Sequence, residues 1–131
     1  MNILHNQLAP LLVLAFLLIT FVISVVEKFT DWQGTIAYIS DTFQNTFIKS
    51  FIKPLIASLV FLEILTVYFV SVGMYELYFY QEKETALLGC TFSCFSILYM
   101  LIGQRIAKDY PGATSLTVYF ILSVFGVYLL N

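Results

Sequence analysis

The chain has 131 residues, of which 60% are hydrophobic and only 11% charged, and its formal net charge is -2. A soluble domain carries about 25% charged residues, so this composition excludes a water-soluble globule and makes lipid the solvent for most of the outside. Because the net charge is slightly negative, the chain also lacks the basic face of a nucleic-acid-binding protein.

The first apolar run covers residues 8–26 and ends at Glu27 and Lys28. Its length is close to the roughly 20 residues that a membrane-spanning helix needs. No Lys or Arg precedes this run and no small-residue cleavage site follows it, so we expect an uncleaved first span rather than a secretory signal. Pro10 falls in the first turn, where its missing N–H costs little.

A short amphipathic helix is predicted over residues 31–47, between the first and second spans. Thr30 and Gln33 fit the S/T-x-x-E/Q pattern of a capping box at its start. We expect this helix to lie in the headgroup plane with Trp32 as an anchor. Its apolar residues recur every three or four positions, at Trp32, Ile36, Ile39, Phe43 and Phe47.

Three more spans follow. The apolar runs predict the second span over residues 54–78, the third over 85–103 and the fourth over 113–130. Asp109 or Tyr110 is expected to cap the fourth helix, with the next proline in its first turn. Four spans in series predict a single all-α domain, an integral membrane antiparallel four-helix bundle with a short interfacial amphipathic helix between spans one and two.

The basic residues suggest an orientation. Only Lys83 lies in the second loop, so the positive-inside rule places the first and third loops in the cytoplasm and both termini on the other side. The first-loop lysines could serve the amphipathic helix instead, which leaves the orientation open. The basic residues of the first and third loops are Lys28, Lys49, Lys53, Arg105 and Lys108.

Glu63 is the clearest candidate for a functional residue. It follows Pro54 by nine positions, which places it about 13 Å into a hydrocarbon core roughly 30 Å thick. An ionised carboxylate at that depth costs at least about 2.5 kcal/mol on the insertion scale. We therefore expect Glu63 to point inward and to be protonated, paired or beside a wet cavity.

Two interpretations of Glu63 remain open. In the structural one, a protonated carboxyl links helices through a hydroxyl or a backbone carbonyl. In the functional one, Glu63 is the exchangeable acid of a proton, cation or quinone site. The candidate hydroxyls are those of Thr20, Ser24, Tyr99 and Ser123.

A second polar group is expected on the side of the first and third loops. Glu27 and Arg105 end spans one and three at the same depth, so they could form an interfacial ion pair. The group could bind an anionic lipid headgroup or a partner, or it could be a set of solvated loop charges. Its members are Glu27, Lys28, Gln104, Arg105, Lys108 and Asp109.

Cys90 and Cys94 lie on one face of the third span, next to a row formed by Gly89 and Ser93. Residues four apart on a helix diverge, so we expect no disulfide and interpret the small residues as a close helix contact, with a redox or metal role as the alternative. His5 is expected to be an ordinary residue at the membrane edge. No metal-ligand spacing or nucleotide fingerprint appears, so the sequence predicts no metal and no bound cofactor other than a quinone.

The chain resembles the DoxX-like family of small four-helix membrane proteins, in the form found in Bacteroidetes-like bacteria. The residues behind this resemblance are 27–29 at the end of the first span, Glu63 in the second and 103–113 before the fourth. The resemblance covers the whole chain and implies a bacterial inner-membrane protein. Members of the family are associated with a quinol oxidase, with thiosulfate oxidation and with oxidative-stress complexes. The chain departs from commoner members in lacking an Arg before the first span.

Three functions fit these observations. The leading one is a non-catalytic accessory or assembly subunit of a larger respiratory or redox membrane complex, whose bundle would carry an outer stripe unsuited to lipid. The second is a quinone-linked oxidoreductase component, which needs a cavity at the depth of Glu63. The third is a small proton or solute transporter with a wet path lined by Ser and Thr. The expected partners are the lipid bilayer and other membrane subunits, and no nucleic acid.

Overall fold

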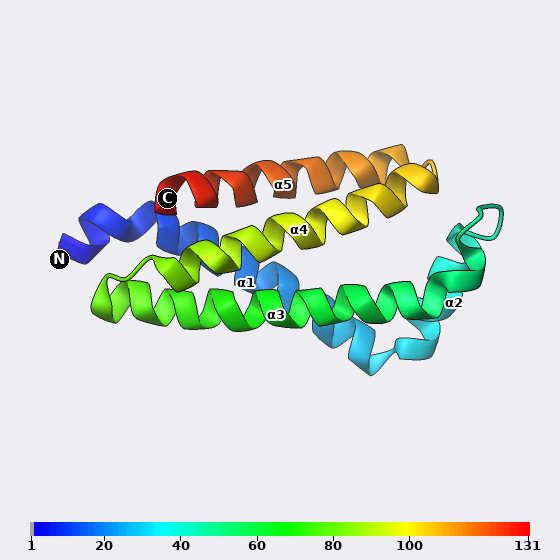
Figure 1. Cartoon of the computed structure of the whole chain (residues 1–131), viewed down its shortest axis with the longest axis horizontal. Coiled ribbons are helices and arrows are strands. Elements are labelled where there is room, and N and C mark those ends of the chain that lie inside the picture. Colours follow the sequence, from blue (N-terminus) through cyan, green and yellow to red (C-terminus); the bar gives the residue numbers. More distant parts are fainter. Residues whose placement is uncertain (1) are drawn as a thin grey trace.

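The computed structural model describes residues 2–131, with side chains for residues 8–48 and 50–131 (Figure 1). The expectation for His5 therefore lies outside the described side chains. Within residues 2–131 all regular secondary structure is helical, with no strand. Its elements are α1 (Asn2–Thr30), α2 (Trp32–Thr42), the short 3-10 helix η1 (Lys49–Phe51), α3 (Ile52–Tyr80), α4 (Glu84–Ile106) and α5 (Tyr110–Leu130).

Four of these helices are long and apolar enough to cross a membrane: α1 from Leu8 onward, α3, α4 and α5. The predicted all-α fold with four apolar helices in series is confirmed at this level. The helix α5 begins three residues before the predicted span because Asp109 caps it. The Asp109 carboxylate accepts a hydrogen bond from the Gly112 N–H at 3.1 Å, and Pro111 lies in the first turn, where it needs no N–H partner.

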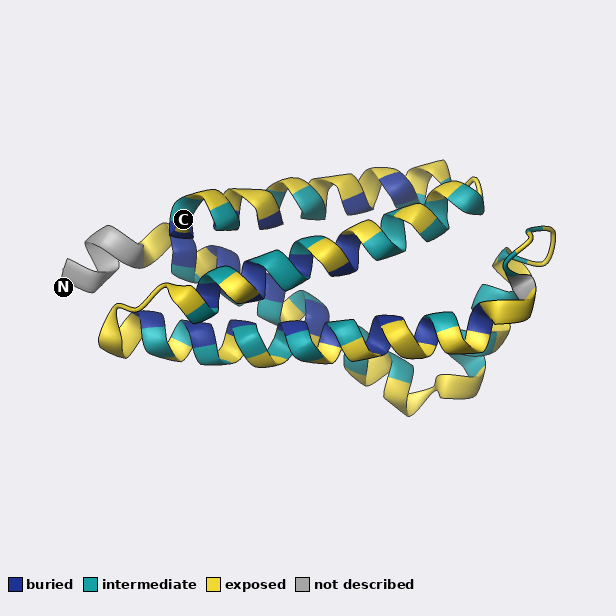
Figure 2. Cartoon of the chain, viewed as in Figure 1, coloured by how far each residue is buried: buried dark blue, intermediate teal, exposed yellow. Residues whose placement is uncertain are grey.

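The helices α3, α4 and α5 lie side by side, joined by turns at opposite ends, and α1 packs mainly against α3 and to a lesser extent against α5 (Figure 1). The helices α3, α4 and α5 each carry buried residues on the side that faces the bundle and exposed residues on the outer side (Figure 2). The main core cluster includes Leu14 and Phe21 of α1, Val70 of α3, Ile97 of α4 and Leu116 of α5. The core therefore draws on all four long helices.

The closest approach between α3 and α4 depends on small residues. A Cβ atom added to Gly73 would lie 2.5 Å from the Ala86 Cα, and one added to Gly89 would lie 2.9 Å from the Val70 backbone nitrogen. The predicted close packing at Gly89 is confirmed. Cys90 is a free, buried thiol whose Sγ lies against Gly126 of α5, so it serves the same close packing on the other side of α4.

The start and end of α2 differ from the prediction. Thr30 belongs to α1, where its hydroxyl donates to the Val26 carbonyl, so the predicted capping box is wrong. Asp31 is the cap instead, accepting a hydrogen bond from the Gly34 N–H at 3.2 Å. The helix ends at Thr42, five residues early, because the chain turns there to bring Phe43 against α3.

The apolar face of α2 packs on protein. The partly buried side chains of Ile36 and Ile39, and of Phe43 just after the helix, contact a small cluster at the beginning of α3, formed by Ile52, Ile56 and Val60. Only Trp32 and Phe47 of the predicted apolar stripe remain exposed. As a result α2 lies across one end of the bundle and covers it.

Replacing Asp109 with Ala is expected to lower the free energy of unfolding by about 1 kcal/mol, because the first turn of α5 loses its side-chain acceptor. Asp109→Asn keeps an oxygen in that position and should retain most of the stability. Unfolding of the purified protein in detergent micelles measures both. If Asp109→Ala matched the unsubstituted protein while Asp109→Asn did not, the capping role would be wrong.

Candidate functional site

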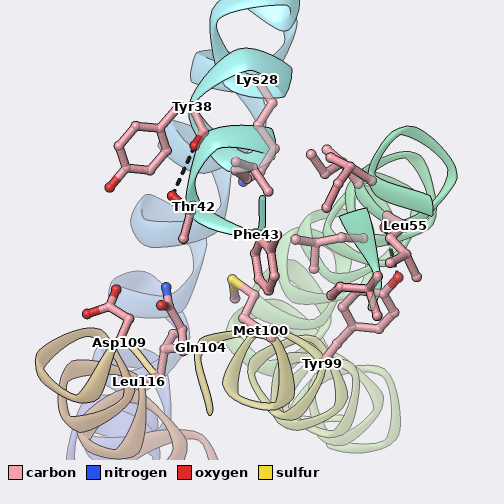
Figure 3. Close-up of a pocket in the computed structure, with 16 residues that line it drawn as sticks. Lys28, Tyr38, Thr42, Phe43, Leu55, Tyr99, Met100, Gln104, Asp109 and Leu116 are labelled. Carbon is pink, nitrogen blue, oxygen red and sulfur yellow. Dashed lines mark hydrogen bonds between the residues drawn. The ribbon is translucent and has the colours of Figure 1, made fainter. Parts of the chain in front are cut away.

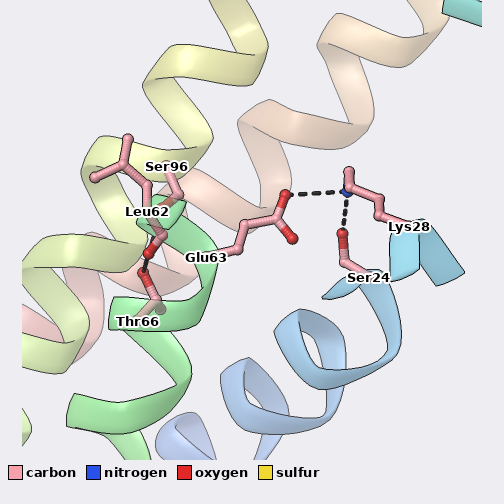
Figure 4. Close-up of polar contacts among 6 residues, drawn as sticks. All are labelled: Ser24, Lys28, Leu62, Glu63, Thr66 and Ser96. Carbon is pink, nitrogen blue, oxygen red and sulfur yellow. Dashed lines mark hydrogen bonds and ion pairs between the residues drawn. The ribbon is translucent and has the colours of Figure 1, made fainter. Parts of the chain in front are cut away.

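The Glu63 carboxyl forms a buried ion pair with Lys28 (Figure 4). Glu63 is 0% exposed, and its Oε1 atom lies 3.0 Å from the Lys28 Nζ atom. The same ammonium donates to the Ser24 hydroxyl at 2.6 Å. The predicted inward orientation of Glu63 is confirmed, and of the three expected ways to compensate its charge the structure shows pairing.

Helix periodicity explains why Ser24 and Lys28 act together. They lie four residues apart on α1, so their side chains share one face. Lys28 lies near the end of the helix, and its apolar stem lets the ammonium reach inward while the side chain stays 14% exposed. The ion pair thereby links the C-terminal end of α1 to a buried position in the middle part of α3.

Hydrogen-bonding capacity remains at both ends of this pair. Of the three N–H donors of the Lys28 ammonium, one meets Ser24 and one meets Glu63. The Oε2 atom of Glu63 is buried and has no hydrogen-bond partner among the described residues. The arrangement can therefore hold two opposite charges in an apolar interior and still offer one donor and one acceptor.

A cavity of about 230 Å³ lies beside Lys28 at the end of the bundle that α2 covers (Figure 3). We call it the α2 cavity. Glu63 itself does not line it, so the pair meets this space through its cation. The lining residues are Lys28, Tyr38, Ile39, Thr42, Phe43, Ile48, Ile52, Leu55, Ile56, Leu59, Tyr99, Met100, Gly103, Gln104, Asp109 and Leu116.

A second space of about 170 Å³ lies between α1, α4 and α5, and we call it the inter-helix hollow. Met100 and Leu116 line both spaces, so the two are neighbours. Its hydroxyl-bearing residues are Thr20 and Ser24 of α1 and Tyr119 of α5, and its other lining residues are apolar. The lining residues are Leu17, Thr20, Phe21, Ser24, Ile97, Met100, Leu116 and Tyr119.

None of the four hydroxyls expected to meet Glu63 does so among the described residues. The Tyr99 hydroxyl donates to the Leu55 carbonyl at 2.8 Å and lies 2.6 Å from the Ser58 hydroxyl. The Ser123 hydroxyl donates to a carbonyl of its own helix. Of the remaining two, Ser24 contacts the cation instead of the acid, and Thr20 lines the inter-helix hollow.

The polar group expected near the first and third loops is not one site. Glu27 and Arg105 are exposed and form no ion pair within the described part of the chain, because the neighbours of α1 are α3 and α5, and α4 lies diagonally across the bundle. The Arg105 guanidinium lies over the Tyr110 ring instead, 5.0 Å from its centroid. Lys28 is committed to Glu63, Gln104 lines the α2 cavity, and Lys108 is exposed.

Lys28 is the functional contact that sequence reasoning missed. The sequence placed it among headgroup candidates because it ends the first span. One available signal was Ser24, which lies one turn earlier on the same face and completes a polar pair on an otherwise apolar helix. A second was that Glu63 lies in an apolar run, where a carboxylate needs a cation as its partner.

Comparison with known proteins finds no match: no protein-family model, no curated protein and no solved structure is similar to the chain. Among the described residues, no group of three or more His, Cys, Asp and Glu side chains could hold a metal ion. The support for a function therefore comes from the ion pair, the two internal spaces and the outer surface of the bundle.

Proposed function

We propose that the chain crosses the bacterial inner membrane four times as an antiparallel bundle and acts as a non-catalytic, DoxX-like accessory or assembly subunit of a larger membrane complex. The four apolar helices support the membrane location, since their outward faces carry large hydrophobic side chains. Within residues 2–131, only α2, η1 and short turns lie outside these helices. Contacts with a partner protein would then lie mainly within the membrane.

The outer face of α3 is the observation that carries this proposal. Tyr68, Ser71 and Tyr75 recur at helical spacing, and all three side chains are exposed. No hydrogen bond joins their hydroxyls to another described residue. Tyr68 lies about 24 Å along a helix of 29 residues, near its middle, where lipid offers no hydrogen-bond acceptor. Such a stripe suits a protein neighbour better than lipid.

The stripe indicates the chemistry of the partner. A phenol in hydrocarbon is best satisfied by a carbonyl, hydroxyl or amide oxygen at the same depth, which a membrane-spanning helix of another subunit can supply. The outer face of α5 is different over its middle, where Val118, Ile121 and Phe125 are exposed and apolar, and its hydroxyls at Thr114 and Tyr128 lie nearer the helix ends. We therefore assign α3 to the partner and α5 to lipid.

A photoreactive amino acid at position 68 is expected to yield a discrete adduct with another membrane protein when native membranes are irradiated. The same amino acid at position 121 serves as the matched control and should react with lipid only. The readout is the mass and identity of the adducts. Tyr68→Phe is expected to reduce recovery of that partner several-fold, since about 1 kcal/mol of hydrogen bonding is lost.

Three outcomes would contradict the accessory role. Equal protein adducts at positions 68 and 121 would mean that α3 has no special surface. The absence of any protein adduct at position 68 would leave the stripe facing lipid. An adduct containing only a second copy of this chain would make the surface a homo-oligomer contact.

The alternatives both require Glu63 to exchange protons. A quinone-linked component or a transporter would need access to its carboxyl from a ligand or from water. The carboxyl is fully buried and bound to Lys28, which favours a role in holding α1 to α3. The accessory role is therefore the better supported of the three functions.

A further inference from the structure

We propose that the α2 cavity binds the headgroup of an uncharged, carbonyl-bearing amphiphile, and that the apolar part of this molecule extends into the inter-helix hollow. This site is separate from the outer face of α3 and goes beyond the accessory role. It rests on the shape of the two spaces, on the unused hydrogen-bond donors that face them and on the balance of charge around them.

The α2 cavity has the form of a ligand site. Apolar side chains from α2, α3, α4 and α5 make most of its wall, and a few polar groups lie among them. At about 230 Å³ it is smaller than the 300–1,000 Å³ typical of sites for drug-sized molecules, so alone it suits only a headgroup. Together with the neighbouring hollow it comes within that range.

Two donors are available to a carbonyl oxygen in this space. Lys28 lines the cavity, and its ammonium has one N–H that neither Ser24 nor Glu63 uses. The Gln104 side chain also lines it and makes no hydrogen bond to another described residue (Figure 3). An acceptor between them would satisfy groups that are otherwise left without partners.

The charges around the cavity select against anions. Lys28 and Glu63 neutralise each other, so the pair has no net charge. Asp109 adds a carboxylate to the lining, and only its Oδ1 atom accepts a hydrogen bond from the start of α5. A fatty acid or a phosphate would be repelled by this carboxylate, whereas an ester, amide or ketone would not.

The residues between the two spaces can make room for the apolar part of the ligand. Met100 and Leu116 line both of them. Methionine is unbranched and flexible, so Met100 can adjust to an apolar chain passing beside it. The remaining contacts in the hollow are supplied by Leu17, Phe21 and Ile97, which offer the apolar surface that such a chain needs.

The test uses a photoreactive monoacylglycerol with a diazirine in its acyl chain, added to the full-length protein in dodecyl maltoside micelles, which contain no carbonyl. Labelling is expected to saturate, to be displaced by unlabelled monoacylglycerol and to map to residues that line the two spaces. The fatty acid probe of the same chain length, ionised at pH 8, is expected to label at least fivefold less. The mapping of labelled residues and the displacement by unlabelled monoacylglycerol use the unsubstituted protein, so these two readouts do not depend on whether a variant folds.

Gly103 and Val118 provide a test variant and its control. Gly103→Leu fills the α2 cavity and is expected to reduce labelling at least fivefold. Val118→Leu, on the outer face of α5, should leave labelling unchanged, because this exposed side chain lines neither space. Gln104→Leu is expected to weaken labelling about fivefold through the lost hydrogen bond. Labelling that maps elsewhere, is equal for the two probes or survives Gly103→Leu would overturn the proposal.

Discussion

Replacing Lys28 with Met is expected to lower the free energy of unfolding by about 3–5 kcal/mol, the largest loss among the substitutions considered. The substitution keeps an unbranched side chain only one heavy atom shorter but leaves the Glu63 carboxylate buried without its cation. The Glu63 side chain is 0% exposed, so water cannot replace the lost partner unless the helices separate. Reversible unfolding in mixed micelles measures the loss.

A double-mutant cycle separates the ion pair from simple packing. Glu63→Gln should cost less than Lys28→Met, because Lys28 is 14% exposed and can turn its ammonium toward the aqueous end of α1. The double variant should recover most of the loss, since it removes both charges. Additive losses would show that the two residues contribute independently. Lost activity in a Glu63→Gln protein that still assembles would instead favour the quinone-linked or transporter function.

Replacing Gly73 with Ala is expected to destabilise the bundle by about 1–3 kcal/mol, although the substitution adds only a methyl group. The new Cβ would lie 2.5 Å from the Ala86 Cα and 2.6 Å from its backbone nitrogen. These are backbone atoms that cannot rotate away, so α3 and α4 have to separate. Thermal unfolding in detergent compares the variants.

Gly103→Ala is the control for this prediction. It introduces the same methyl group into α4, where the nearest atom, in the Phe43 ring, is 3.5 Å away. We expect its stability to equal that of the unsubstituted protein or slightly exceed it, because Ala is the better helix former. Equal stabilities for the two variants would mean that the contact between Gly73 and Ala86 is not close in the folded protein.

The features that could be predicted from the sequence are those set by a local residue pattern or by the position of a residue within a long apolar run. An apolar run long enough to span lipid has few alternatives to a helix, so four such runs fixed the number and order of the long helices. Asp109 before Pro111 indicates a cap in any fold that starts a helix there. The burial of Glu63 follows from its position in an apolar run, whichever helix it faces.

The features that could not be predicted depend on which helices are neighbours. Glu27 and Arg105 end two spans on the same side, but α1 and α4 lie diagonally across the bundle, so the expected pair does not form. The partner of Glu63 was missed for the same reason, because nothing in the sequence states that the end of α1 lies against α3. The apolar face of α2 could equally suit lipid, and only the tertiary fold shows that it packs on Ile52 and Ile56.

Lys28 takes part in two equilibria at once. Its ammonium pairs with Glu63 of α3, and the Lys28 side chain also lines the α2 cavity. Only three residues separate Lys28 from Trp32, the first residue of α2. A molecule that draws this cation toward itself weakens its hold on the acid, and by thermodynamic linkage a tighter hold disfavours the molecule. The spacing of α1 and α3 and the contents of the α2 cavity are thus both tied to a single side chain.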